Sequence, residues 1–314
     1  MVGFMSVFWT CVPMDTLDLR LMLFLCVKST FKELPMKFST SSHLLGMLFI
    51  VFALGVSAQQ VPTGFQLVWG DEFDQDGAVD AEKWHHQTQF PRGTSWHNGE
   101  KQAYTDRIDN SYVADGYLHI VAIREDYTSE GVTKAYTSAR LNSKFAFTYG
   151  RVEVRAKLAM GLGVWPAIWT LGQDITEKGG YWEPTHGTAG WPAIGEIDIM
   201  EHWGDNPQVI QAALHTPSSK GNTVNVKAIT GEDVGNTFHV YSMEWTPDQI
   251  DFFYDDKVFY TYRPEEKNKD TWPFDSPQYL LLNVAMGGTH RVIDPDFTQS
   301  ELVIDYVRVY QKEE

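Results

Sequence analysis

Three carboxylate side chains lie within six residues of a segment that is otherwise apolar: Glu196, Asp198 and Glu201 are separated only by isoleucine and methionine. A glycosidase needs two carboxyl groups beside one glycosidic bond, one protonated and the other ionised. The segment can supply both, with a third acid to adjust them. The competing interpretation is a strand whose acids face solvent, and the spacing alone is equally compatible with it. The flanking aromatic residues Trp191 and Trp203 favour a cleft, because the C–H faces of sugars stack on aromatic rings.

The spacing of the acids adds information, because alternate residues of a β-strand face the same side. Glu196 and Asp198 should therefore share one face, while the isoleucines that follow them face a core. Glu201 has the wrong parity for that face in a regular strand. A β-bulge near Met200 would return Glu201 to the side of the other two acids, and bulges are common beside active sites.

The elements that must position these acids are strands. Runs of residues that alternate between polar and apolar with period two recur after residue 64, and they lie at 118–123, 151–158, 238–245, 250–254, 258–262 and 302–310. Asp255-Asp256-Lys257 predicts a tight hairpin turn between two of these runs. With no long amphipathic helix, the pattern predicts an all-β fold, an antiparallel sandwich of two sheets. The glycine-rich segments 161–163 and 179–190 predict loops at the rim of the cleft.

The chain resembles glycoside hydrolase family 16, in its laminarinase (endo-β-1,3-glucanase) branch, from about residue 65 onward. The matching segments follow the family's order, at 69–73, 97–105, 140–144, 163–169, 195–201, 283–288 and 305–310. The resemblance implies a β-jelly roll whose concave sheet carries the substrate cleft. It also implies a retaining mechanism in which Glu196 is the nucleophile, Glu201 is the acid/base, and Asp198 interacts with the nucleophile.

The resemblance further implies a set of substrate-binding residues, with His215 near the acid/base: Asn98, Glu100, Arg140, Trp165, Trp169, Trp191 and His215. The two tryptophans of the 163–169 segment are four residues apart and so share a face in a regular strand. The alternative for them is the core, where tryptophan is commonly found. A structural role is likewise the alternative for His215.

Many members of this family hold a structural calcium on the convex side, away from the cleft. The matching positions are Glu72, Gly150 and Asp305, and oxygen ligands suit this hard cation. We expect the calcium to stabilise the fold, and we expect no cofactor for catalysis.

Two departures from the family pattern affect substrate preference. Gly99 stands where relatives often have asparagine, and Thr289-His290-Arg291 replaces a segment that typically contains glycine or tryptophan. The substrate expected is β-1,3-glucan or mixed β-1,3/1,4-glucan. The extra residue at Met200 favours the laminarinase-like branch, although agarases, which cut galactans, share it. Non-catalytic β-glucan-binding relatives have usually lost a catalytic glutamate, and this chain retains both.

Composition and the N-terminus limit the partners and the location. The formal net charge of −16 argues against nucleic acid or an anionic membrane as a partner. Residues 36–58 have the basic start, 13-residue apolar run and small-residue end of a signal peptide cleaved near Ala58; a membrane anchor or a buried helix fits less well. Residues 1–35 then read as an upstream extension from a mis-assigned start, and residues 59–314 as the catalytic domain. We expect a secreted or periplasmic monomer without disulfides, because both cysteines precede residue 36.

Overall fold

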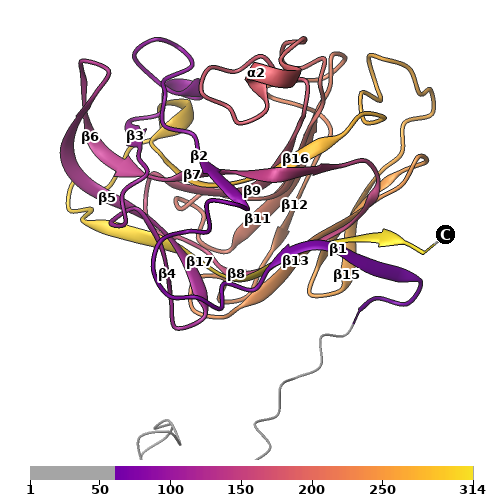
Figure 1. The fold of residues 1–314 in the computed structure, drawn as a ribbon, viewed down its shortest axis with the longest axis horizontal. Coiled ribbons are helices and arrows are strands. Elements are labelled where there is room, and N and C mark those ends of the chain that lie inside the picture. Colours follow the sequence, from indigo (N-terminus) through magenta and orange to yellow (C-terminus); the bar gives the residue numbers. More distant parts are fainter. Residues whose placement is uncertain (1–60, 314) are drawn as a thin grey trace, which may run out of the picture. The chain divides into compact units, whose positions relative to one another are not determined.

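The computed structural model describes residues 61–313, which form a sandwich of two β-sheets (Figure 1). The signal peptide and the upstream extension expected before residue 59 lie outside the described residues. Residues 61–313 belong to one compact unit. The sandwich confirms the predicted all-β jelly-roll class.

The larger sheet has ten strands. Eight follow the order β15-β14-β13-β8-β17-β5-β6-β3, while β1 pairs with β17 and β4 with β5. All pairs are antiparallel except β3 with β6, which is parallel. The bounds are β1 Phe65–Asp71, β3 Gln102–Tyr104, β4 Ser111–Ala114, β5 Tyr117–Ser129, β6 Val132–Ser138, β8 Gly150–Lys157, β13 His239–Trp245, β14 Ile250–Tyr254, β15 Lys257–Tyr262 and β17 Gln299–Lys312.

The smaller sheet carries the acidic run. Its seven strands follow the order β12-β11-β10-β9-β16-β7-β2, and each pair is antiparallel. The bounds are β2 Trp84–His86, β7 Arg140–Phe147, β9 Val164–Gly172, β10 Glu196–His202, β11 Val209–His215, β12 Val226–Thr230 and β16 Gln278–Met286. The acids thus lie near the middle of this sheet, on β10 between β9 and β11.

The core fills the space between the sheets. On β8, Val152, Val154 and Ala156 are fully buried, as the period-two pattern predicts, and on β10 Ile197 and Ile199 join the same apolar cluster. These inward isoleucines leave the other face of the smaller sheet free for the acids.

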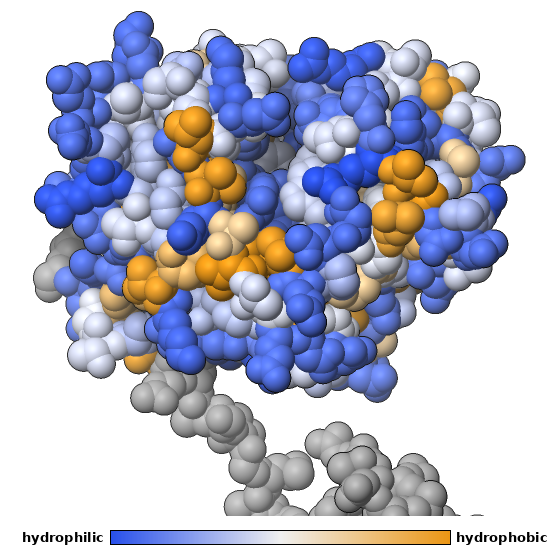
Figure 2. Space-filling model, turned by 180° about the vertical axis from the view of Figure 1, so that it is seen from behind, coloured by the Kyte–Doolittle hydropathy of each residue, from blue (hydrophilic) through white to orange (hydrophobic). Residues whose placement is uncertain are grey.

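Helices are few and short in the described part of the chain. They are α2 Glu183–His186 and two 3₁₀ turns, η1 His97–Gly99 and η2 Gly288–His290. α2 and its loop lie on the outer side of the smaller sheet (Figure 1). No helix within residues 61–313 has the length and apolar character needed to cross a membrane. On the face opposite to that of Figure 1, apolar side chains form small groups among polar ones (Figure 2).

The predicted hairpin is confirmed. Asp255 and Asp256 form the turn between β14 and β15, with φ of 47° and 63°. Positive φ at both central residues is the signature of the turn whose twist matches that of the flanking strands.

Candidate active site

A β-bulge in β10 brings the three acids to one face. The pairing of β10 with β11 shifts register between Asp198 and Glu201, and its pairing with β9 shifts between Asp198 and Met200. Two consecutive side chains, Ile199 and Met200, consequently point into the core, where they are 2% and 1% exposed. The predicted bulge is confirmed, and it returns Glu201 to the face of Glu196 and Asp198.

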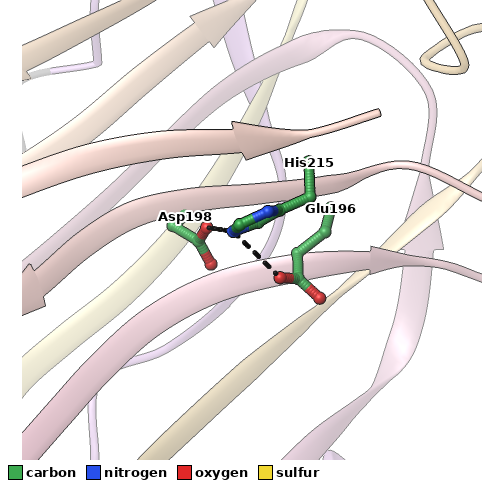
Figure 3. A group of neighbouring side chains, drawn as sticks. All are labelled: Glu196, Asp198 and His215. Carbon is green, nitrogen blue, oxygen red and sulfur yellow. Dashed lines mark ion pairs between the residues drawn. The ribbon is translucent and has the colours of Figure 1, made fainter. Parts of the chain in front are cut away.

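The first acid, Glu196, is held by an indole and an imidazole. Trp191 Nε1 donates a hydrogen bond to Glu196 Oε2 at 3.1 Å. His215 Nε2 lies 3.6 Å from Glu196 Oε1 and 3.3 Å from Asp198 Oδ2 (Figure 3). His215 faces Glu196 directly across the β10–β11 pair and bridges the first two acids, and it also acts electrostatically on Glu201.

The last acid, Glu201, has a different pair of partners. Trp165 Nε1 on β9 donates to Oε1, and Gln211 Nε2 on β11 donates to Oε2, both at 3.0 Å. The two N–H donors fix the plane of the carboxyl group, while each oxygen keeps a second lone pair that can carry a proton. The Trp165 ring also stacks on Trp203, with ring centroids 4.0 Å apart.

Burial and mutual repulsion raise the pKa of all three acids. Burial, followed by the charge of Asp198, raises the pKa of Glu196 to about 8. Burial and then the charge of Glu201 hold the pKa of Asp198 well above its usual range. Burial also raises the pKa of Glu201, against the hydrogen bonds from Gln211 and Trp165. Three close carboxyls do not ionise together readily, so their protons titrate as those of one coupled cluster.

A second polar network lies around Arg140 on β7. Its guanidinium carbon is 5.1 Å from the Trp96 ring centroid and 4.9 Å from that of Trp169. Its NH2 donates to Glu177 Oε2 at 2.7 Å. Trp169 Nε1 in turn donates to Asn283 Oδ1 at 2.7 Å. Arg140 therefore lies between two aromatic rings and orients one of the expected cleft tryptophans.

The remaining expected binding residues differ in their exposure. Asn98 is exposed in η1, with a left-handed φ of 54°. Glu100 is buried and accepts hydrogen bonds from Gln102 Nε2 and the Tyr104 hydroxyl, and burial raises its pKa to about 7. Trp191 is 43% exposed, the most exposed of the expected tryptophans, and so is available to stack on a sugar.

The sequence analysis did not single out Glu177 and Gln211, and it named Arg291 only as part of a departure from the family pattern and Trp203 only as an aromatic flank. Gln211 could have been predicted from the sequence, because a polar side chain on a strand beside the acids is expected to face them. Glu177 lies in a loop and Arg291 after η2, and no periodic signal marks either one.

The expected calcium ligand set does not converge in the structure. Gly150 lies against the carbonyl of Tyr310, five residues along β17 from Asp305, which corresponds to roughly 16 Å of strand. The carboxylate of Glu72 forms a two-bond ion pair with Arg308, and that of Asp305 pairs with Arg155. The assignment of Gly150 to one ion with Asp305 is therefore wrong. A different trio, Glu196, Asp198 and His215, offers ligand atoms within 4.8 Å of one another, but their ion pairs already account for this proximity.

Comparisons with known proteins agree with the site. The model of the glycosyl hydrolases family 16 matches residues 98–308. A beta-glucanase from Rhodothermus marinus is 40% identical over 86% of this chain and 94% of its own length. A variant of LamA from Zobellia galactanivorans, solved with laminaritriose and laminaritetraose, has a TM-score of 0.72 and 48% identity over 78% of this chain and 98% of that chain. SCLam, a non-specific endo-β-1,3(4)-glucanase, has a TM-score of 0.71 and 39% identity over 81% of this chain and 94% of that chain. The jelly roll, the acids on the bulged strand and these matches together place the chain in glycosyl hydrolase family 16, among the glycoside hydrolases similar to laminarinases.

Proposed function

We propose that this protein is a retaining endo-β-glucanase that hydrolyses β-1,3-glucan, including chains with mixed β-1,3 and β-1,4 links. The observation that carries the proposal is the bulge that places Glu201 on the same face as Glu196 and Asp198. Relatives named beta-glucanase and endo-β-1,3(4)-glucanase, and one solved with laminari-oligosaccharides, support this substrate class.

In the first step, ionised Glu196 attacks the anomeric carbon and Glu201 gives its proton to the departing glycosidic oxygen. The C–O bond breaks, and a glycosyl ester forms on Glu196. Glu196 must be ionised before it attacks, and His215 and Arg140 favour this form against the burial and the neighbouring acids that raise its pKa. In the second step, Glu201 takes a proton from water, which attacks the anomeric carbon and frees Glu196. Two displacements at one carbon retain its β configuration.

Each neighbour of the acids has a role in this sequence. Trp191 donates a hydrogen bond to Glu196, and His215 acts on it electrostatically. Both interactions favour the ionised form of Glu196. Trp165 and Gln211 aim the carboxyl of Glu201. Trp191 also offers an exposed aromatic surface beside the nucleophile, which suits the apolar face of a glucosyl unit.

The test is product analysis on laminarin, lichenan, agarose and carrageenan. We expect laminarin, and to some degree lichenan, to yield oligosaccharides whose new reducing ends are first released as the β anomer. Glu201→Gln should lose cleavage of laminarin, and Glu196→Ala should lose formation of the covalent intermediate. Release of the α anomer first would overturn the retaining mechanism, and cleavage of agarose without laminarin would favour the agarase-type alternative. Binding of laminarin without any cleavage would indicate a glucan-binding protein.

The proposal extends to location and assembly. The sequence pattern of residues 36–58 supports export and cleavage near Ala58, and the polymeric substrate would be met outside the cytoplasm. We further propose that the protein is a monomer. Binding of a structural calcium on the convex side stays a prediction.

A further inference from the structure

Three side chains form a stacked column that ends at Glu201. The guanidinium carbon of Arg291 lies 4.0 Å from the ring centroid of Trp203. Trp203 stacks on Trp165, with centroids 4.0 Å apart and an interplanar angle of 25°. The Trp165 indole N–H then donates to Glu201 Oε1 at 3.0 Å. The column therefore connects a surface arginine, 32% exposed in its side chain, to a buried carboxyl group.

The outer end of the column is held from two sides. Arg291 forms an ion pair with Asp205, which lies two residues after Trp203 in the turn that follows β10. The backbone N–H of Arg291 donates to the carbonyl of Gly288 at 3.2 Å, which closes the η2 turn. Arg291 thus links η2 to the turn after the catalytic strand.

The backbone that delivers Arg291 to this position is strained. Thr289 and His290 have φ of 54° and 64°, in the left-handed region that side chains other than glycine seldom adopt. For the β-branched Thr289 this conformation is a genuine outlier, and such strain concentrates at functional positions. The segment 289–291 is also one of the two places where the sequence departs from its family pattern.

The inner end of the column is confined as well. A methyl group on Gly288 would lie 2.6 Å from Trp165 Cζ3, so the ring is already in close contact with this backbone. With Trp203 on another side, Trp165 has little freedom to turn. A fixed indole in turn fixes the direction of its N–H, and hence of the Glu201 carboxyl group.

We propose that Arg291 is a positioning residue for the general acid/base, acting through Trp203 and Trp165 to aim Glu201 at the glycosidic oxygen. This proposal rests on the proposed function, in which Glu201 protonates the leaving group. A cation on an indole face is attracted by the ring quadrupole, so the contact with Arg291 holds Trp203 against Trp165. An uncharged side chain at position 291 leaves Trp203 and Trp165 free to move apart. The carboxyl group of Glu201 is then less well oriented toward the glycosidic oxygen.

The charge of Arg291 also acts directly on Glu201, where it opposes the rise in pKa caused by burial. The groups that face this carboxyl come from four elements: Glu196 and Asp198 on β10, Gln211 and His215 on β11, Trp165 on β9, and Arg291 after η2. Removal of the Arg291 charge raises the pKa of Glu201, so the acid form persists to higher pH. The basic limb of the pH profile of kcat/KM should therefore move upward.

The experiment compares two substrates that differ in their need for an acid. Laminarin has a sugar leaving group that must be protonated, whereas an aryl β-1,3-glucobioside with a 2,4-dinitrophenolate leaving group departs without one. For Arg291→Gln we expect kcat/KM on laminarin to fall roughly tenfold and on the aryl glycoside to change by less than about twofold. The basic limb should move upward in Arg291→Gln and stay in place in Arg291→Lys, which keeps the charge.

The control is Arg263→Gln, which removes an exposed arginine at the end of β15 and should leave both substrates unaffected. Equal losses on the two substrates, or an unmoved basic limb in Arg291→Gln, would overturn the positioning role. If Arg291→Gln does not fold, Trp203→Phe supplies the test, because a shorter ring in the column should again impair laminarin and spare the aryl glycoside. Failure of the wild-type protein to cleave either substrate would instead overturn the proposed function.

Discussion

Arg140 and Glu177 form a buried ion pair at 2.7 Å that ties the loop after β9 to strand β7. Their side chains are 5% and 8% exposed. Glu177 also contacts His97 Nε2 at 2.7 Å and accepts from Gln87 Nε2 at 3.0 Å. One carboxylate thereby connects β7, η1, the residue after β2 and the loop that leads to α2.

Removal of the negative charge at Glu177 should destabilise the fold, because it leaves the Arg140 guanidinium buried without its counter-ion. For Glu177→Gln we expect the free energy of unfolding to fall by about 3 kcal/mol, measured by urea denaturation near neutral pH. The matched control is the next residue: Lys178→Ala removes an exposed ion pair with Glu130 and should cost less than about 1 kcal/mol.

The acid stability of the protein should depend on the same residue. Burial alone would raise the pKa of Glu177, but Arg140 and His97 outweigh it and hold the pKa at about 2, below the ordinary value of 4.5. The stabilisation is therefore present above pH 4.5 and is lost as the pH falls toward about 2. The gap between wild type and Glu177→Gln should narrow over that window, and a constant gap would contradict this account.

Gly288→Ala should impair catalysis through Trp165. The added methyl group would lie 2.6 Å from Trp165 Cζ3 and 2.7 Å from Cε3, so the ring must move and the N–H that aims Glu201 moves with it. We expect kcat on laminarin to fall between roughly tenfold and a hundredfold, because small displacements at a reacting centre have large effects on rate. Gly190→Ala is the steric control, since a methyl group there meets nothing within 4 Å. Equal activity of the two variants would show that Trp165 has room to adapt.

The active-site acids should make the protein less stable at alkaline pH. Burial, and next the charge of Asp198, raises the folded pKa of Glu196 from 4.5 to about 8. A raised pKa means that the folded state binds this proton more tightly than the unfolded state does. The contribution of Glu196 to the free energy of unfolding is fully present below pH 4.5 and decreases as the pH rises through about 8.

The measurement is the melting temperature between about pH 5 and about pH 9. It should decline in the wild type and decline less steeply in Glu196→Gln, which cannot ionise at this position. Glu82→Gln, a change at an exposed glutamate, should follow the wild-type curve. A Glu196→Gln curve parallel to that of the wild type would refute the assignment of this proton to Glu196.

Much of the fold and the central chemistry could be predicted from the sequence, because both depend on local patterns. The period-two alternation of β8 is a property of neighbouring residues, and so is the parity of Glu196, Asp198 and Glu201 that demands a bulge. The order of the family motifs then identified the jelly roll and the candidate roles of two glutamates.

The identity of the distant residues that support those acids depends on the three-dimensional packing. Arg140 and Glu177 are 37 residues apart, and Trp165 and Glu201 are 36 apart; no periodicity links members of such pairs. The error at Gly150 has the same origin, because a motif match does not show which residues of two strands lie opposite each other. The β8–β17 pairing separates Gly150 from Asp305. The order of the residues alone requires three acids to share one strand and a bulge to bring them to one face. The packing of β9, β11 and the η2 turn around that strand decided how each acid is aimed, because contacts across a sheet depend on strand order and register.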